Sequence, residues 1–301
     1  MGYIESILAR FSLTDAKVHA TPMVPAVTYS KDNSLKNQVE VACMRKVPYR
    51  EAIGSLIYAT IAKRPDITFA ISILSQFLDN LGEAHWEGVK QIFRYLAGMK
   101  DRMLTYGEER HGLLGYTNVD RASQLHHQAI SGYAFLIDGG VVSWSSWKQE
   151  LITLSTAEAE YIAAMHAMKE CIWLRCLIGE IFPRLIDQTT LFCDNQATLQ
   201  LVTDDNYHMC TKHIDICFHF IYQMVEDGSI NLIYCSTDNM TANILTKALL
   251  HWKVATHVLR LGLCRASRGV LDSGTPGKPK AESDKALGSM GGHIACSTIA
   301  G

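Results

Sequence analysis

Several acidic residues lie at the ends of predicted strands or helices, where their side chains could form part of a catalytic or ligand-binding site. Asp194 follows the apolar run TTLFC and precedes a stretch with helical character. Open α/β sheets bind ligands in the crevice beyond the carboxyl ends of their strands, so Asp194 is a candidate site residue. An Asp in this position also serves as the N-cap of a following helix. The residue by itself is compatible with both roles.

A second pair of acids lies in the stretch LSTAEAEYIA. Ser155 and Glu158 have the spacing of a capping box, which predicts that a helix begins here. Glu158 and Glu160 are two residues apart, so on a helix they point to nearly opposite sides. Since Glu158 already has a capping role, Glu160 is the candidate for chemistry. The alternative for Glu160 is a surface position favoured by the helix dipole.

The elements that must position these acids change in character along the chain. Residues 3–11 are compatible with a short helix, and residues 20–47 with an extended linker. Apolar residues then recur at helical spacing in three stripes, which predict core helices: Ile53, Leu56, Ile57 and Ile61; Ile67, Ala70, Ile71, Leu74 and Leu78; and Trp86, Val89, Ile92, Phe93 and Leu96.

From about residue 112 the pattern becomes that of short strands. The runs GLLGYTN, SGYAFLI, VVSWSSW and ELITLS are rich in β-forming residues, and Gly139-Gly140 marks a hairpin turn. A helix from 155 to about 181, a strand at TTLFCDNQ, a helix at 211–226, a strand at SINLIYCS and a helix at 239–250 follow. This order predicts an α/β domain with a mixed sheet, antiparallel strands first and parallel strands later, and helices packed against it.

Composition restricts the class of partner and the compartment. The formal net charge is −2 and the pI is 6.6, so there is no basic excess, and any contact with nucleic acid must come from a local patch. Nine cysteines occur singly, which predicts free thiols in a reducing intracellular compartment, cytoplasm or nucleus, and no zinc site. The first residues, MGYIESILARF, lack a signal peptide's apolar core, and no apolar run approaches the ~18 residues of a membrane span.

Eight sequence motifs together resemble the Pol polyprotein of copia-type LTR retrotransposons over roughly residues 1–265. They are VPYREAIGSLIYATIAKRPDITFAISILSQF, HWEGVKQIFRYLAG, SGYAFLI, VSWSSWKQ, LSTAEAEYIA, CDNQAT, TKHIDICFHFI and TANILTKAL. The resemblance implies that 1–46 is the C-terminal remnant of a reverse transcriptase with a linker, 47–104 a helical connection region, and 110–250 a ribonuclease H-like domain with a five-stranded mixed sheet. Residues 266–301, which have no periodicity and an excess of Gly, Ser, Pro and Lys, are expected to be disordered.

The resemblance also implies a chemistry, the hydrolysis of RNA–DNA hybrids by two Mg²⁺ (or Mn²⁺) ions held among four carboxylates. The four positions fall on Asn118, Glu160, Asp194 and Asn243, of which only Glu160 and Asp194 are acids able to ligate a metal as charged groups. An Asn keeps the shape of an Asp but replaces one oxygen by an NH₂ group that cannot ligate. The expected activity is therefore lost or reduced. No Tyr-x-Asp-Asp motif occurs, so DNA polymerisation is not expected.

Other residues bear on this hypothesis. Asp120 lies two residues beyond Asn118, on the same strand face at about 6–7 Å, and could ligate a displaced metal. Lys212 and His213 match the family's T-K-H-I-D motif and could lie near the nucleic acid, or could belong to the exposed first turn of a helix capped by Thr211. The alternative function is a non-catalytic module on the same fold that binds nucleic acid or protein. The sequence does not indicate an oligomeric state.

Overall fold

Helices and 3₁₀ turns are the regular elements among the described residues up to Gly98 in the computed structural model. They are α1 (Tyr3–Arg10), α2 (Gln38–Met44), α3 (Tyr49–Ala62), α4 (Thr68–Leu74) and α5 (Glu83–Gly98), with 3₁₀ turns at Lys31–Asn33, Pro65–Ile67 and Ser75–Phe77. The structure describes residues 2–25, 27–35, 38–107, 112–121, 128–150, 156–182, 188–196, 199 and 220–265.

The three apolar stripes form these helices as predicted, because their residues share one buried cluster. Ile61 is an exception, since it is 72% exposed at the last turn of α3. The prediction of an extended linker over residues 20–47 was wrong in part, because this range contains the Lys31–Asn33 turn and α2. The turn is held by local hydrogen bonds between Ser30 and the side chain of Asn33, a signal that apolar periodicity does not carry.

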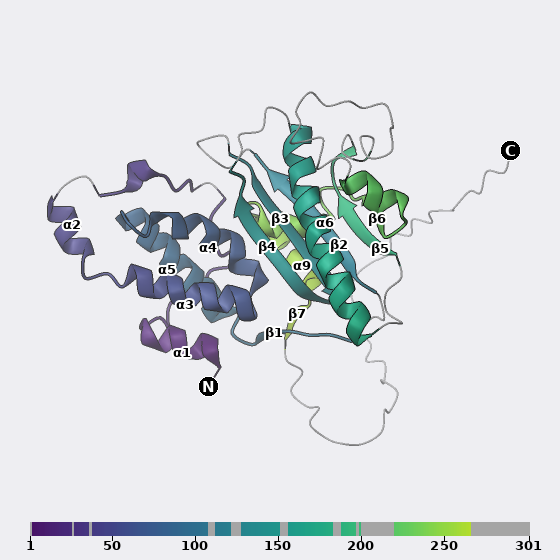
Figure 1. The fold of residues 1–301 in the computed structure, drawn as a ribbon. Helices are drawn as coiled ribbons and strands as arrows, with labels where there is room; N and C mark the ends of the chain where they lie inside the picture. The colour runs from purple at the N-terminus through teal and green to yellow at the C-terminus, as the bar shows by residue number, and fades with distance from the viewer. Residues whose placement is uncertain are drawn as a thin grey trace, which may run out of the picture. The chain divides into compact units, whose positions relative to one another are not determined.

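The sheet has five strands, and Figure 1 shows them running side by side. They are β2 (Leu114–Asp120), β3 (Ile130–Ile137), β4 (Gly140–Lys148), β5 (Thr189–Cys193) and β6 (Ile230–Tyr234), in the order β4-β3-β2-β5-β6. The pairs β2–β3 and β3–β4 are antiparallel, whereas β2–β5 and β5–β6 are parallel. This confirms the predicted α/β class and the mixed five-stranded sheet.

Two residues make the hairpin turn between β3 and β4. Asp138 has a φ of 48° and Gly139 a φ of 79°, so both lie in the left-handed region that a two-residue type I′ turn requires. Asp tolerates this region better than most residues, and Gly is unrestrained there. The hairpin was predicted at Gly139-Gly140, and the structure places the turn one residue earlier, with Gly140 already paired to Ile137.

Alternate residues of β3 face two different layers. Phe135 belongs to the apolar cluster of α6 (Thr156–Ile181), the helix that crosses the front of the sheet in Figure 1. Ala134 and Leu136 belong to the cluster that includes α9 (His251–Arg260), which lies behind the strands in that view. Both faces of the sheet are therefore covered by helices, as the period-2 pattern of a buried strand requires.

The prediction of one helix over 239–250 was wrong. The segment forms a 3₁₀ helix, η5 (Thr241–Leu245), followed by α9, which was not predicted. All five residues of η5 are buried, so the segment has no polar face to give an α-helical period. It lies so close to the sheet that a Cβ added to Gly132 of β3 would come within 2.8 Å of the Leu245 Cβ.

A small antiparallel sheet of β1 (Arg102–Leu104) and β7 (Leu263–Arg265) was also missed, because three-residue strands have too little pattern to recognise. The predicted strand ELITLS, the cap residue Ser155, the first part of the helix at 211–226 and the tail at 266–301 lie outside the described residues. Within the described part of the chain, no helix is long and apolar enough to cross a membrane.

The helices α3 and α4 pack against β4, an edge strand of the sheet. The Trp144 Nε1 donates to the Thr60 backbone carbonyl at 3.1 Å, and the hydroxyls of Ser72 and Ser146 are 3.2 Å apart. Ile130 and Leu136 of β3 share a buried cluster with Leu56 of α3 and Leu74 of α4. These helices therefore share one buried cluster with one face of the sheet, and Trp144 packs against that cluster at the junction.

Candidate functional site

The parallel pair β2–β5 brings candidate residues to one edge of the sheet. Tyr116 is paired with Phe192, and the same offset two residues further on places Asn118 level with Asp194. Because side chains alternate along a strand, Asn118 and Asp120 share a face with Tyr116, whose ring stacks on that of Phe192 at a centroid distance of 5.1 Å. The carboxyl end of β5, at Asp194, is where the strand pattern predicted a site, and the family resemblance added Asn118 at the end of β2.

Asn118 is buried, with 1% of its surface exposed, and its amide is fully engaged as a donor. The Asn118 Nδ2 donates to the Asn243 Oδ1 at 3.0 Å and to the Thr246 Oγ1 at 2.6 Å. The Asn243 Nδ2 in turn donates to the Thr237 carbonyl at 2.6 Å. A neutral hydrogen-bonded pair thus joins β2 to η5 at the two positions where the family resemblance implies acids.

The carboxylate of Asp194 extends this network. Its Oδ2 accepts from the Thr237 hydroxyl at 3.2 Å. Its Oδ1 is buried and has no hydrogen-bond partner among the described residues. Burial raises the pKa of Asp194, while the bond from Thr237 and the charge of Lys247 oppose that rise.

Glu160 reaches the site from the first turns of α6. Its side chain is buried, as expected for the inward one of the two acids, and Glu158 is half-buried. The Glu160 Oε2 has no hydrogen-bond partner among the described residues. Burial, and then the charge of Asp194, raise the pKa of Glu160 to about 9, with Lys247 lowering and Asp120 raising it. Glu160 therefore holds a proton at neutral pH in the metal-free protein.

These residues do not fit a two-metal cage. Two of the four positions are amides whose NH₂ groups bond within the protein, so only two acids are left at these positions. In the described ranges, no group of three or more His, Cys, Asp or Glu side chains is arranged to hold a metal ion. What remains is one unpartnered oxygen on Glu160 and one on Asp194, which are hard ligands of the kind Mg²⁺ prefers.

Sequence reasoning missed three residues of this site. The positive charge near Glu160 comes from Lys247. Two hydroxyls of the hydrogen-bond network come from Thr246 and Thr237. A signal existed for two of them, since Thr246 and Lys247 follow Asn243 by three and four residues within TANILTKAL. Lys212 and His213 lie outside the described residues, and their predicted role stays a prediction.

The strand order, the helix α6 and the convergence of Glu160 with the ends of β2 and β5 define a ribonuclease H-like domain. Comparison with known proteins gives the family. No protein-family model matches the chain. It is 41% identical over 248 residues to the retrovirus-related Pol polyprotein from transposon TNT 1-94 of Nicotiana tabacum, a match that covers 82% of this chain and 19% of that polyprotein.

A second relative is the retrovirus-related Pol polyprotein from transposon RE1 of Arabidopsis thaliana, with 32% identity over 266 residues, 87% of this chain and 18% of that protein. The chain belongs to the Pol polyproteins of copia-type transposons, and it spans about a fifth of their length. The secreted RxLR effector protein 161 of Plasmopara viticola is 39% identical over 137 residues, which are 44% of this chain and 94% of that protein.

Solved structures give weaker matches. The structure of LC11-RNase H1 in complex with RNA/DNA hybrid aligns with a TM-score of 0.33 and 14% identity over 44% of this chain and 93% of its own. The foamy viral protease-reverse transcriptase in complex with dsDNA aligns with a TM-score of 0.39 and 12% identity over 67% of this chain and 42% of its own.

Proposed function

We propose that the chain is a Pol-derived protein that binds RNA–DNA hybrids and whose hydrolysis of the RNA strand is lost or reduced. The observation that carries this proposal is the 3.0 Å hydrogen bond between the Asn118 Nδ2 and the Asn243 Oδ1. This bond joins two neutral amides at two of the four positions where the family resemblance implies carboxylates. In the chemistry that the family resemblance implies, metal ions held by carboxylates would supply activation of water and stabilisation of the leaving oxygen. Glu160 and Asp194 are the two acids left at these positions to hold a metal.

The negative charge left at the site indicates how far the rate of hydrolysis should fall. Glu160 and Asp194 supply at most two negative charges, and Glu160 must first lose its proton. A single Mg²⁺ or Mn²⁺ held weakly by these two residues, with Asp120 as the next acid, is what the remaining oxygens support. Removing one group that stabilises a transition state commonly slows a reaction ~10²-fold or more, and two losses in one site need not add.

We place the protein inside the cell, in keeping with its single cysteines.

The test is cleavage of a labelled RNA–DNA hybrid by the full chain, in Mg²⁺ and in Mn²⁺. The wild type is compared with Asn118→Asp/Asn243→Asp and with the same double variant that also carries Glu160→Gln. We expect an inert or slow wild type, an active double variant and an inert triple variant. A wild type that cuts as fast as the double variant, and loses this activity on Glu160→Gln, would overturn the proposal and make Asp120 the residue to examine.

The second candidate is a module that binds nucleic acid without cutting it. One observation favours it, which is that the Asn118–Asn243 pair closes the site without a cation. Both candidates bind hybrid in EDTA, so cleavage by the Asn118→Asp/Asn243→Asp variant distinguishes them. Full affinity in EDTA, together with a double variant that does not cut, is expected of the non-catalytic module only.

A further inference from the structure

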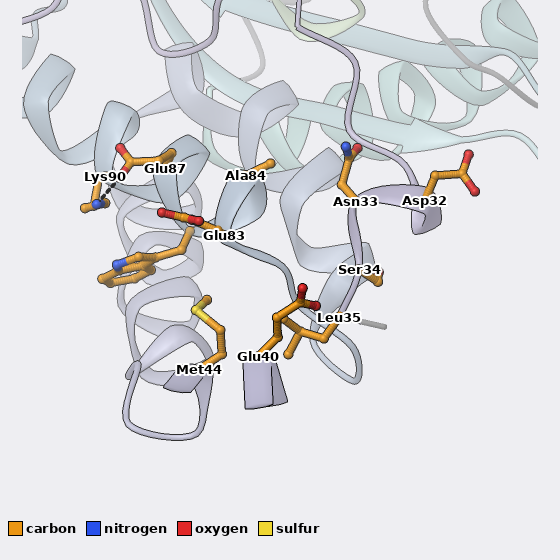
Figure 2. Close-up of a pocket in the computed structure, with 11 residues that line it drawn as sticks. Asp32, Asn33, Ser34, Leu35, Glu40, Met44, Glu83, Ala84, Glu87 and Lys90 are labelled. Carbon is orange, nitrogen blue, oxygen red and sulfur yellow. Dashed lines mark hydrogen bonds and ion pairs between the residues drawn. The ribbon is translucent and has the colours of Figure 1, made fainter. Parts of the chain in front are cut away.

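Two pockets on the helical part of the chain have opposite charge. The first has a volume of about 580 Å³ and lies among α2, α5 and the turn at 32–35. Figure 2 shows its acidic residues and Lys90, which pairs with Glu87. The acids in its lining are Asp32, Glu40, Glu83 and Glu87. Like charges repel, so this face disfavours a phosphate backbone.

The second pocket has a volume of about 300 Å³ and lies between the start of α1, the end of α3 and residues 100–103. Lys63, Lys100 and Arg102 line it with positive charge. Among the described residues of its lining Glu5 is the one acid, and its carboxylate accepts a hydrogen bond from the Gly2 backbone at 2.9 Å. The pocket therefore has an excess of positive charge in a protein whose net charge is −2.

The buried Arg64 side chain links the two segments that carry Lys63 and Lys100. The Arg64 guanidinium is 2% exposed, with its Nε 2.8 Å from the Asp66 Oδ1 and its Nη2 2.5 Å from the Oδ2. The Arg64 Nη1 also donates to the Met99 carbonyl at 3.2 Å. Lys63 and Lys100 are the sequence neighbours of Arg64 and Met99. The bond therefore joins the end of α3 to the end of α5 at the point where both lysines project.

The three cations of the pocket remain available to an anion. Lys63 and Lys100 are exposed, and within the described ranges neither has an acid at ion-pair distance. Arg102 is half-buried and spends its Nη1 on the Leu263 carbonyl at 3.0 Å, which anchors the side chain. The Arg64 charge does not contribute, because Asp66 neutralises it.

An aromatic platform forms one wall. Tyr58 is 59% exposed, and its ring meets that of Tyr3 edge-on at a centroid distance of 4.8 Å. The Tyr3 hydroxyl donates to the Ser55 carbonyl at 2.9 Å, which braces the pair against α3. An exposed ring beside lysines and an arginine is the combination that binds single-stranded nucleic acid, with the base stacked and the phosphates paired.

We propose that this pocket binds one nucleotide of a nucleic-acid strand, with the phosphates on Lys63, Lys100 and Arg102 and the base on Tyr58. It supplies the local patch that the sequence requires of a nucleic-acid-binding protein without a basic excess. The choice of ligand rests on the proposed function. The pocket itself belongs to the helical part of the chain and uses none of the residues of the carboxylate site.

The experiment measures binding of a short labelled single-stranded DNA to the full chain across a series of salt concentrations. Lys63→Gln/Lys100→Gln is compared with Arg45→Gln/Lys46→Gln, which removes two exposed charges outside the pocket. The slope of log K against log salt is negative, and each phosphate contact on a single strand contributes about −0.7 to it. Loss of two contacts in the pocket variant should therefore make the slope less steep by about 1.4. Relative to 1 M salt, this is a loss of about 25-fold in affinity at 0.1 M salt. The control should lose much less.

Stacking is tested separately by Tyr58→Leu, with Trp252→Leu, another half-exposed aromatic, as its control. We expect the Tyr58 variant to lose about fivefold or more in affinity, with the salt slope unchanged. Circular dichroism of each variant confirms that it is folded. Equal losses in the pocket and control variants would overturn the proposal, as would a wild type that does not bind at low salt or a polyglutamate competitor as effective as DNA.

The outcome is independent of the cleavage test. One result would refute nucleotide binding by the pocket and retain the proposed function. In it, the pocket variant binds DNA normally and the Asn118→Asp/Asn243→Asp variant cuts hybrids. A pocket variant that loses DNA, beside a double variant that does not cut, keeps the pocket and overturns the hydrolytic origin of the site.

Discussion

At the scale of single residues, the Asn118–Asn243 pair replaces electrostatic repulsion with a hydrogen bond. Two carboxylates at 3.0 Å would repel unless a cation lay between them, whereas two amides need no cation. The change therefore alters the conditions under which the domain is stable, in addition to its chemistry.

The first prediction concerns this stability. In EDTA, Asn118→Asp/Asn243→Asp should lower the free energy of unfolding by about 3–5 kcal/mol, the usual cost of uncompensated buried charge. Millimolar Mg²⁺ should restore much of it, and should leave the wild type nearly unchanged. Urea unfolding with and without Mg²⁺ measures both. The control is Asn33→Asp, an exposed residue whose oxygen accepts from the Ser30 backbone and would still do so as a carboxylate. A double variant as stable as the wild type in EDTA would contradict the prediction.

The second prediction concerns pH. The pKa of Glu160 is about 9 in the folded protein and near 4.5 when unfolded, so the folded state binds more protons between these values. Stability is then greatest below pH 4.5 as far as this group is concerned, and it falls as the pH rises towards 9, by up to about 1.4 kcal/mol per unit. Glu160→Gln should remove this dependence between pH 7 and 9, and Glu158→Gln should not. Parallel pH profiles for the wild type and Glu160→Gln would refute it.

The residues of the site were predictable in type but not in bonding. The pattern of strand ends placed Asp194 at an edge of the sheet, the capping box favoured Glu160 over Glu158, and the family resemblance supplied Asn118 and Asn243. The pairing of Asn118 with Asn243 joins residues 125 positions apart, and the raised pKa of Glu160 depends on its burial. Neither follows from spacing, because both depend on tertiary packing.

At the scale of elements, the turn between α3 and α4 is held by a buried charge network. Arg64 and Asp66 form a bidentate pair, and the Tyr95 hydroxyl donates to the Asp66 Oδ2 at 2.6 Å. The third prediction is that Asp66→Ala lowers the free energy of unfolding by about 3–5 kcal/mol, because it leaves Arg64 buried without its partner. Asp79→Ala breaks the exposed pair with Arg50 and should cost less than about 1 kcal/mol. Urea unfolding compares the two, and similar losses would contradict the prediction.

Elements with a clear residue pattern were predictable, and those without one were not. The stripe from Val89 to Leu96 predicted α5, whereas β3, buried on both faces, was recognised from the β-forming residues of SGYAFLI. The segment at 241–245 is buried on all sides, so its sequence has no period from which to tell a 3₁₀ helix from an α-helix. The strands β1 and β7 hold each other, and neither has a pattern of its own.

At the scale of the whole molecule, the helices protect an edge of the sheet. Contacts from Thr60 and Ser72 cover β4, and the Tyr106 hydroxyl donates to the Val141 carbonyl at 2.9 Å. An uncovered edge strand is a template for pairing with other chains. The fourth prediction is that a chain lacking residues 1–98 self-associates at concentrations where the full chain is monodisperse. Light scattering at matched concentrations measures this, and a monodisperse shortened chain would contradict it.

The pairing of β1 with β7 has a consequence for synthesis on the ribosome. Arg102 lies opposite Arg265, and its side chain bonds a carbonyl 161 residues away along the chain. At about 5–20 residues per second, translation of the intervening segment takes roughly 8–30 seconds. During that interval the helices can assemble, but β7, which pairs with β1, and Leu245, which lies against Gly132 of β3, have not yet been synthesised. The nascent protein therefore exposes an unpaired β1 to chaperones and proteases until β7 emerges.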